Sequence, residues 1–78
     1  MITTLELIGK QVVITDVVGG KNRIMGTPRI KMVPERGVVL FDDDKGETRF
    51  AHLKDFDNFI DGQAAWIHPN EVLICIKS

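Results

Sequence analysis

The stretch AAWIHPNEVLICI, residues 64–76 of a 78-residue chain, is the strongest indication of its fold. Two apolar runs, 64–67 and 72–76, flank the polar segment His68-Pro69-Asn70-Glu71. Both runs are typical of strands, and a proline supplies a helical φ angle at the start of a turn. We therefore predict a strand at 64–67, a 3₁₀ turn at 69–72 and a final strand at 72–76.

The chain before this stretch also reads mainly as strands. Segment 11–18 is dense in β-branched residues, and segments 37–41 and 47–53 flank an acidic turn in which Gly46 takes the left-handed position. Phe56, Phe59 and Ile60 have helical spacing and predict a short helical insert near 55–61, capped by Asp55. A further helical turn is expected at 3–9.

Residues 19–36 form a long, irregular excursion. Glycine and proline interrupt it at 19–20, 26 and 28, and the runs 24–25 and 30–33 are expected to be the arms of an irregular hairpin that ends at Pro34.

WIHPNEVLICI resembles the C-terminal signature of SH3 domains, in which a tryptophan precedes a proline-containing 3₁₀ turn. The early run GKQVVI, residues 9–14, is similar to the opening of SH3-like barrels. The resemblance implies an all-β fold, a small SH3-like barrel of about five strands. The chain has no ALYDY-like stretch, so polyproline binding is not carried over. The alternative is an Sm-like barrel, which would use residues 3–8 as its N-terminal helix and would imply a ring-shaped homo-oligomer.

Composition predicts one folded domain over residues 1–78, because 44% of the residues are hydrophobic and 27% are charged. The single cysteine, Cys75, cannot form an internal disulfide, which favours the reducing cytoplasm. The N-terminus lacks the pattern of a signal peptide, and no apolar run is long enough for a spanning helix, so no membrane association is expected.

Strand alternation predicts which side chains form the core. In segment 47–53, Phe50 and His52 share one face, while Ala51 and Leu53 share the other. We assign the face of Phe50 to the interior. The predicted core is Val12, Ile14, Val39, Phe41, Phe50, Ile67, Val72 and Ile74.

The sequence predicts no catalytic, cofactor or metal site. No local motif surrounds His52, His68 or Cys75, as a nucleophile and its base would require. The run Asp42-Asp43-Asp44 lacks the ligand spacing of a calcium loop and is interpreted as an acidic turn.

Charge is unevenly distributed along the chain. Residues 21–36 hold five basic residues against Glu35, a net charge of +4, whereas residues 42–61 hold seven acidic residues against three basic ones, a net charge of −4. One interpretation is that the two segments neutralise each other at the surface. The other is that the excursion is a contact surface, because binding residues gather on long loops.

We therefore expect a non-catalytic binding module, a regulatory, inhibitory or accessory protein that contacts a protein partner. Arginine and methionine are common in such interfaces, whereas the excursion has no aromatic residue for stacking on bases. RNA or DNA binding through the basic excursion is the alternative. The candidate contact residues are Lys21, Arg23, Met25, Arg29, Lys31, Met32, Arg36, Trp66 and His68.

Overall fold

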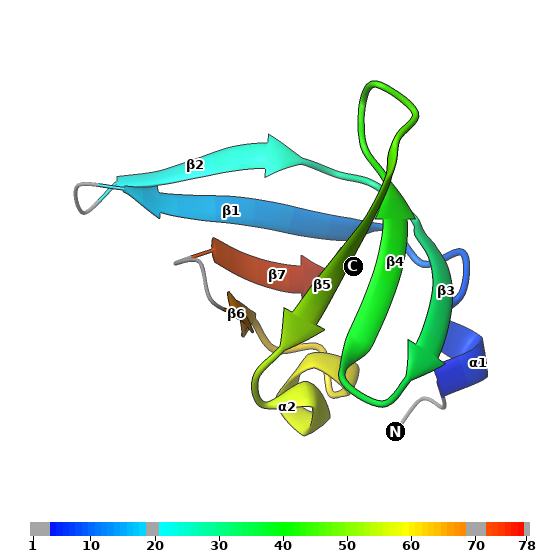
Figure 1. Ribbon diagram of the computed structural model, residues 1–78. Coiled ribbons are helices and arrows are strands. Elements are labelled where there is room, and N and C mark those ends of the chain that lie inside the picture. The colour runs from blue at the N-terminus through cyan, green and yellow to red at the C-terminus, as the bar shows by residue number, and fades with distance from the viewer. Residues whose placement is uncertain (1–3, 19–20, 69–71, 78) are drawn as a thin grey trace.

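A computed structural model describes residues 4–18, 21–68 and 72–77, except for the side chains of Val18 and His68. In this part of the chain, seven strands and two short helices follow one another (Figure 1). The all-β class is therefore confirmed, with more strands than the sequence predicted. The elements are α1 Thr4–Leu7, β1 Val12–Val18, β2 Lys21–Gly26, β3 Ile30–Glu35, β4 Val38–Asp42, β5 Thr48–Leu53, α2 Phe56–Ile60, β6 Ala65–His68 and β7 Val72–Ile76.

All seven strands belong to one antiparallel sheet with the order β2-β1-β7-β6-β5-β4-β3. The sheet curls, so that β4 and β5 cross in front of β1 and β7 in Figure 1. It does not close into a barrel, because no ladder joins its end strands β2 and β3 among the described residues. A single antiparallel bridge, Gln11 to Arg29, connects the start of β1 to the residue before β3.

The excursion at 19–36 is not a separate hairpin, and this prediction was wrong. Its first half, β2, pairs with β1, while its second half, β3, pairs with β4 (Figure 1). The change of partner falls at Thr27 and Pro28, between the two strands, where proline has no N–H to donate to a ladder. Pro34 does not end β3 but lies within it, which is tolerated because β3 is an edge strand.

The other local predictions have mixed outcomes. Gly46 has φ +79° in the turn between β4 and β5, as expected. The helical insert exists as α2, but Asp55 makes no side-chain cap and has a left-handed φ of 56° instead. Residues 69–71 of the predicted 3₁₀ turn lie outside the described residues, while Val72 already belongs to β7. No helix in the described part of the chain is long and apolar enough to cross a membrane.

The core lies on the concave side of the sheet, where the two helices cover one end. The helix α2 packs against β6 and β7, and α1 against β3. Phe59 and Leu7 from these helices are fully buried. Sequence reasoning did not place either of them in the core, because it assigned the core to strand residues alone. The buried apolar residues are Leu7, Val12, Ile14, Ile30, Val38, Val39, Ala51, Phe56, Phe59, Ile60, Ala65 and Ile74.

The predicted core is correct for four residues and wrong for one. Val12, Ile14, Val39 and Ile74 are buried, while Phe41, Ile67 and Val72 are half-buried. Phe50 is 67% exposed. On β5 the inward residue is Ala51, which pairs with the buried Val39. The alternation was recognised, but the larger side chain was assigned to the wrong side.

The contrast between two phenylalanines tests this assignment of faces. We expect Phe59→Ala to lower the free energy of unfolding by about 3–5 kcal/mol, because a fully buried ring leaves a cavity. Phe50→Ala should change it by no more than about 0.5 kcal/mol, as for most surface substitutions. Urea denaturation of both variants checks this, and equal losses would contradict the assignment.

Candidate binding groove

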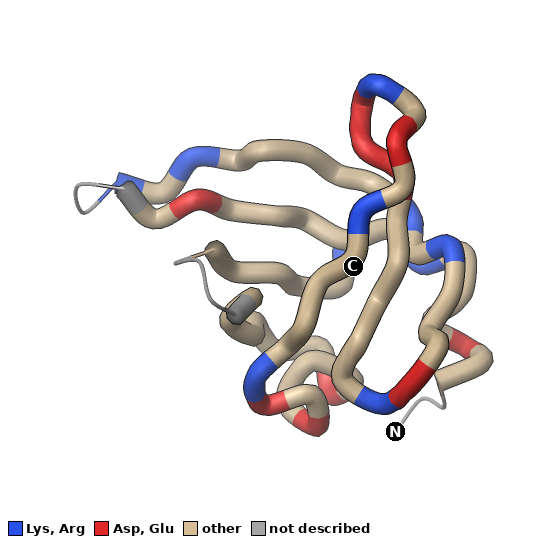
Figure 2. Tube along the Cα trace, in the orientation of Figure 1, with Lys and Arg blue, Asp and Glu red and all other residues tan. Residues whose placement is uncertain are grey.

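The five basic residues of the 21–36 segment do not form one patch. They are spread along β2, β3 and the connections after each strand, with acidic residues nearby (Figure 2). Three of them form ion pairs, Arg23 with Asp16 at 3.7 Å, Lys31 with Asp42 at 3.3 Å, and Arg36 with Asp57. The last two pairs join the basic segment to the acidic one, as the neutralisation interpretation expected.

Two of these arginines make further contacts within the fold. The Arg36 guanidinium lies 5.3 Å from the centre of the Phe56 ring, over its face. The Nη1 group of Arg29 donates a hydrogen bond of 3.0 Å to the carbonyl of Gly9, beside the bridge that joins β1 to β3. These side chains therefore connect elements of the fold. As a result, fewer unpaired positive charges are available at the surface than the number of basic residues in the sequence indicates.

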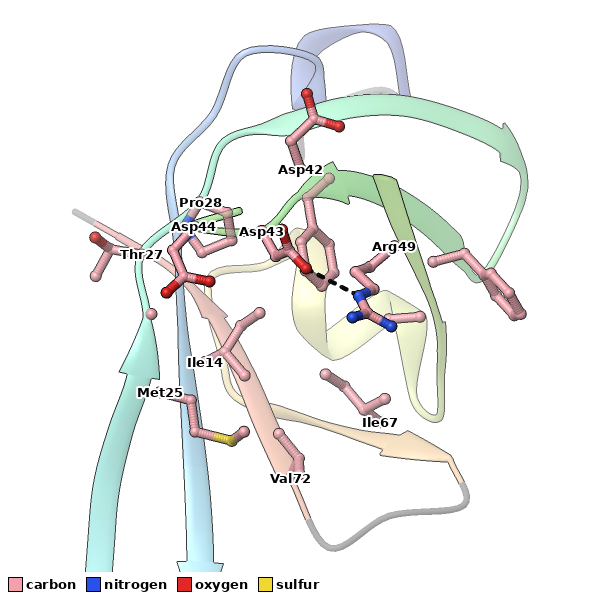
Figure 3. Close-up of a pocket in the computed structure, with 14 residues that line it drawn as sticks. Ile14, Met25, Thr27, Pro28, Asp42, Asp43, Asp44, Arg49, Ile67 and Val72 are labelled. Atoms are coloured by element: carbon pink, nitrogen blue, oxygen red, sulfur yellow. Dashed lines mark hydrogen bonds and ion pairs between the residues drawn. The ribbon is translucent and has the colours of Figure 1, made fainter. Parts of the chain in front are cut away.

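A groove of about 700 Å³ opens between the β1–β2 pair and the β4–β5 pair (Figure 3). Its floor is apolar and comes from five strands of the sheet, because alternate residues of each strand face the concave side. One large exposed side chain also lines it, Met25 from β2, which is 58% exposed. Phe50 borders the groove on β5, but it alternates with the inward Ala51, so its side chain lies on the opposite face of the strand. The floor residues are Ile14, Phe41, Ala51, Ile67 and Val72.

The groove exists because the core fills only part of the concave side. The helix α2 and its buried Phe59 fill one end of the concave side, where α2 packs against β6 and β7. The groove lies at the other end, where Gly26, Thr27 and Pro28 form one wall. A β-bulge in the β1–β2 ladder, between Ile14 and Thr15, accommodates the extra residue Met25.

The turn between β4 and β5 places three carboxylates and one guanidinium along the groove. The Oδ1 atom of Asp43 accepts hydrogen bonds from the backbone N–H groups of Glu47 and Lys45, both at 2.9 Å. Its Oδ2 atom accepts one from Nε of Arg49 at 3.0 Å. These bonds lower the pKa of Asp43. The bond from Glu47 has the largest effect, and the bond from Arg49 has the next largest. The hydrogen bond to Asp43 likewise raises the pKa of Arg49.

The neighbouring carboxylates differ in their partners. Asp42 accepts hydrogen bonds from the Thr48 hydroxyl at 2.8 Å and from Lys31 at 3.3 Å, and these interactions, Thr48 first, lower its pKa. Asp44 is exposed and makes no side-chain hydrogen bond or ion pair within the described residues. The turn is therefore a fixed structure that leaves one carboxylate at the groove without a partner.

Of the candidate contact residues whose side chains the structure describes, Met25 alone lines the groove. Met32 lies on β3 and Trp66 on β6, exposed by 52% and 42%, and neither belongs to the groove. His68 lies opposite His52 in the sheet, but its side chain is outside the described residues. Sequence reasoning missed Asp44 and Arg49, because they line the same space as Met25 only through the curl of the sheet.

The Cys75 thiol and the His52 ring both contact other groups of the fold. The half-buried Cys75 thiol lies 3.5 Å from the Gly62 carbonyl, and His52 meets Phe50 edge-on with ring centres 5.5 Å apart. In the described part of the chain, no group of three His, Cys, Asp or Glu side chains is placed to hold a metal ion. No family model, curated protein or solved structure matches the chain. Function therefore has to be inferred from the groove.

The pKa of Asp43 makes the turn sensitive to acid. Because its folded pKa lies below its unfolded value of about 3.9, ionised Asp43 stabilises the fold at neutral pH, and this contribution disappears as pH falls through the lowered pKa. We expect Asp43→Asn to have a lower Tm than the wild type at pH 7. The difference should shrink progressively below about pH 4.

Asp44→Asn is the matched control, since its side chain has no partner among the described residues. Its Tm should follow that of the wild type at every pH. Thermal denaturation followed by circular dichroism measures both variants, and a Tm difference for Asp43→Asn that is independent of pH would contradict the role of its charge.

Proposed function

We propose that the protein is a non-catalytic binding module that recognises a protein partner through the groove, in a regulatory, inhibitory or accessory role. The observation that carries this proposal is a concave, apolar floor that is only half-buried at Phe41, Ile67 and Val72, beside the large exposed side chain of Met25. Apolar surface that stays exposed and concave is typical of interaction sites. Methionine and aromatic side chains are enriched in protein interfaces, and methionine adapts its shape to a partner.

The free edge of β2 supports a protein partner as well. Among the described strands, β2 pairs only with β1, so its other edge has unpaired backbone groups. Ile24 on this strand is 66% exposed, next to Met25. An extended segment of a partner can pair with such an edge while its side chains enter the adjacent pocket.

Nucleic acid is the weaker candidate because the cations that would neutralise phosphates are engaged within the chain. Arg23, Lys31 and Arg36 each have a carboxylate partner. Asp44 adds a carboxylate without a partner beside the groove. A phosphate backbone binds best to a continuous surface of available positive charge.

The proposal also covers the type of fold and the cellular compartment. We assign the curled sheet to the SH3-like type, with the Gln11–Arg29 bridge as the start of a closure between its two halves. A single free cysteine, half-buried against a backbone carbonyl, is suited to the reducing cytoplasm.

Site-specific photo-crosslinking in the native cells tests the proposed function. A photoreactive residue such as p-benzoylphenylalanine replaces Met25 or the exposed Thr27 at the groove, or the exposed Asn58 on α2 as a control. We expect the two groove positions to crosslink the same protein, and nuclease treatment should not remove the adduct. Position 58 should not crosslink this protein. Adducts that nuclease removes, or equal crosslinking at position 58, would contradict the proposal.

The partner identified in this way allows a matched measurement of affinity. Met25→Ala should weaken binding by about tenfold, as expected for an anchor at an interface. Met32→Ala is the control, because Met32 is similarly exposed but lies outside the groove. Its affinity should equal that of the wild type in the same titration.

A further inference from the structure

We infer that the groove selects an extended segment of a partner protein in which a basic side chain lies next to an apolar one. This inference rests on the proposed function and specifies the chemistry of the partner. The apolar side chain would contact the floor around Ile14, Ile67 and Val72, and the basic side chain would pair with Asp44.

The charge of the groove supports a basic side chain. Three carboxylates and the guanidinium of Arg49 line it, which gives a net charge of −2. Arg49 neutralises Asp43, and Lys31 pairs with Asp42, so the remaining negative charge is centred on Asp44. The hydrogen bonds from Lys45 and Glu47 to Asp43 hold the turn, so this carboxylate is presented without a reorganisation of the loop.

The position of Asp44 links this charge to the apolar floor. In Figure 3 its side chain lies on the side of the groove where Thr27, Pro28 and Met25 are drawn, and all four residues line the same space. A lysine or arginine can lay its aliphatic stem along Met25 and Pro28 while its charged end reaches the carboxylate. An apolar neighbour in the same segment would then face the floor.

A second copy of the chain fits this groove poorly. Three of the basic residues of the 21–36 segment are already paired within the fold. Antiparallel pairing of β2 with β2 of a second copy, centred on Asn22, would also place Lys21 opposite Arg23 of the other strand, so that like charges meet across the new ladder. The occupant is therefore a segment of another protein.

Three matched peptides test the inference by NMR, in which valine alternates with lysine, with glutamine or with glutamate. The methyl signals of Ile14, Ile67 and Val72 report occupancy of the groove. We expect the lysine peptide to bind about two- to fivefold more tightly than the glutamine peptide, as for an exposed ion pair, and the glutamate peptide to bind most weakly. Asp44→Asn should remove the preference for lysine, whereas Asp61→Asn, a control at the exposed end of α2, should retain it.

The possible results separate the two proposals. Equal occupancy of the groove by all three peptides, or a preference for glutamate, would overturn the charge selectivity and leave the groove as a protein-binding site. Shifts away from the groove, or no shifts with any peptide, would overturn the proposed function as well. Methyl shifts that depend on protein concentration without peptide would identify a second copy as the occupant and overturn the inference.

Discussion

The bridge between residue 11, just before β1, and residue 29, just before β3, holds the two halves of the sheet together. The backbone N–H of Val12 donates to the carbonyl of Pro28 at 2.9 Å, and that of Ile30 donates to the carbonyl of Lys10 at 2.9 Å. These bonds, with the Gln11–Arg29 pair, fix the chain where it leaves one half of the sheet and enters the other. The curl of the sheet, and therefore the groove inside it, follows from this junction.

The same junction explains why the interior is divided into a filled end and an open end. The bridge brings the two halves of the sheet together near α1, which packs against β3. The helix α2, with its buried Phe56 and Phe59, packs against β6 and β7. Beyond Pro28 no ladder joins the two halves among the described residues, and Met25 of β2 remains exposed beside the open space.

Much of the fold followed from short-range patterns, and the groove did not. The β-branched run of β1, the glycine of the β4–β5 turn and the spacing of Phe56 and Phe59 indicated their elements, because each pattern acts over a few residues. Which strand pairs with β2 depends on contacts between distant segments. The secondary-structure propensity of single residues does not encode such contacts. For the same reason the sequence could not show that Arg36 would pair with Asp57, or that Asp44 would face the space lined by Met25.

A sheet needs a second layer over its apolar face. Here two short helices provide that layer for one end of the concave face. The floor around Ile67 and Val72 is half-buried, so the described residues leave its covering incomplete. A bound segment would supply the missing layer, and the acidic turn beside it would decide which segments do so. The open end of the fold and its proposed selectivity thus belong to the same concave face of the sheet.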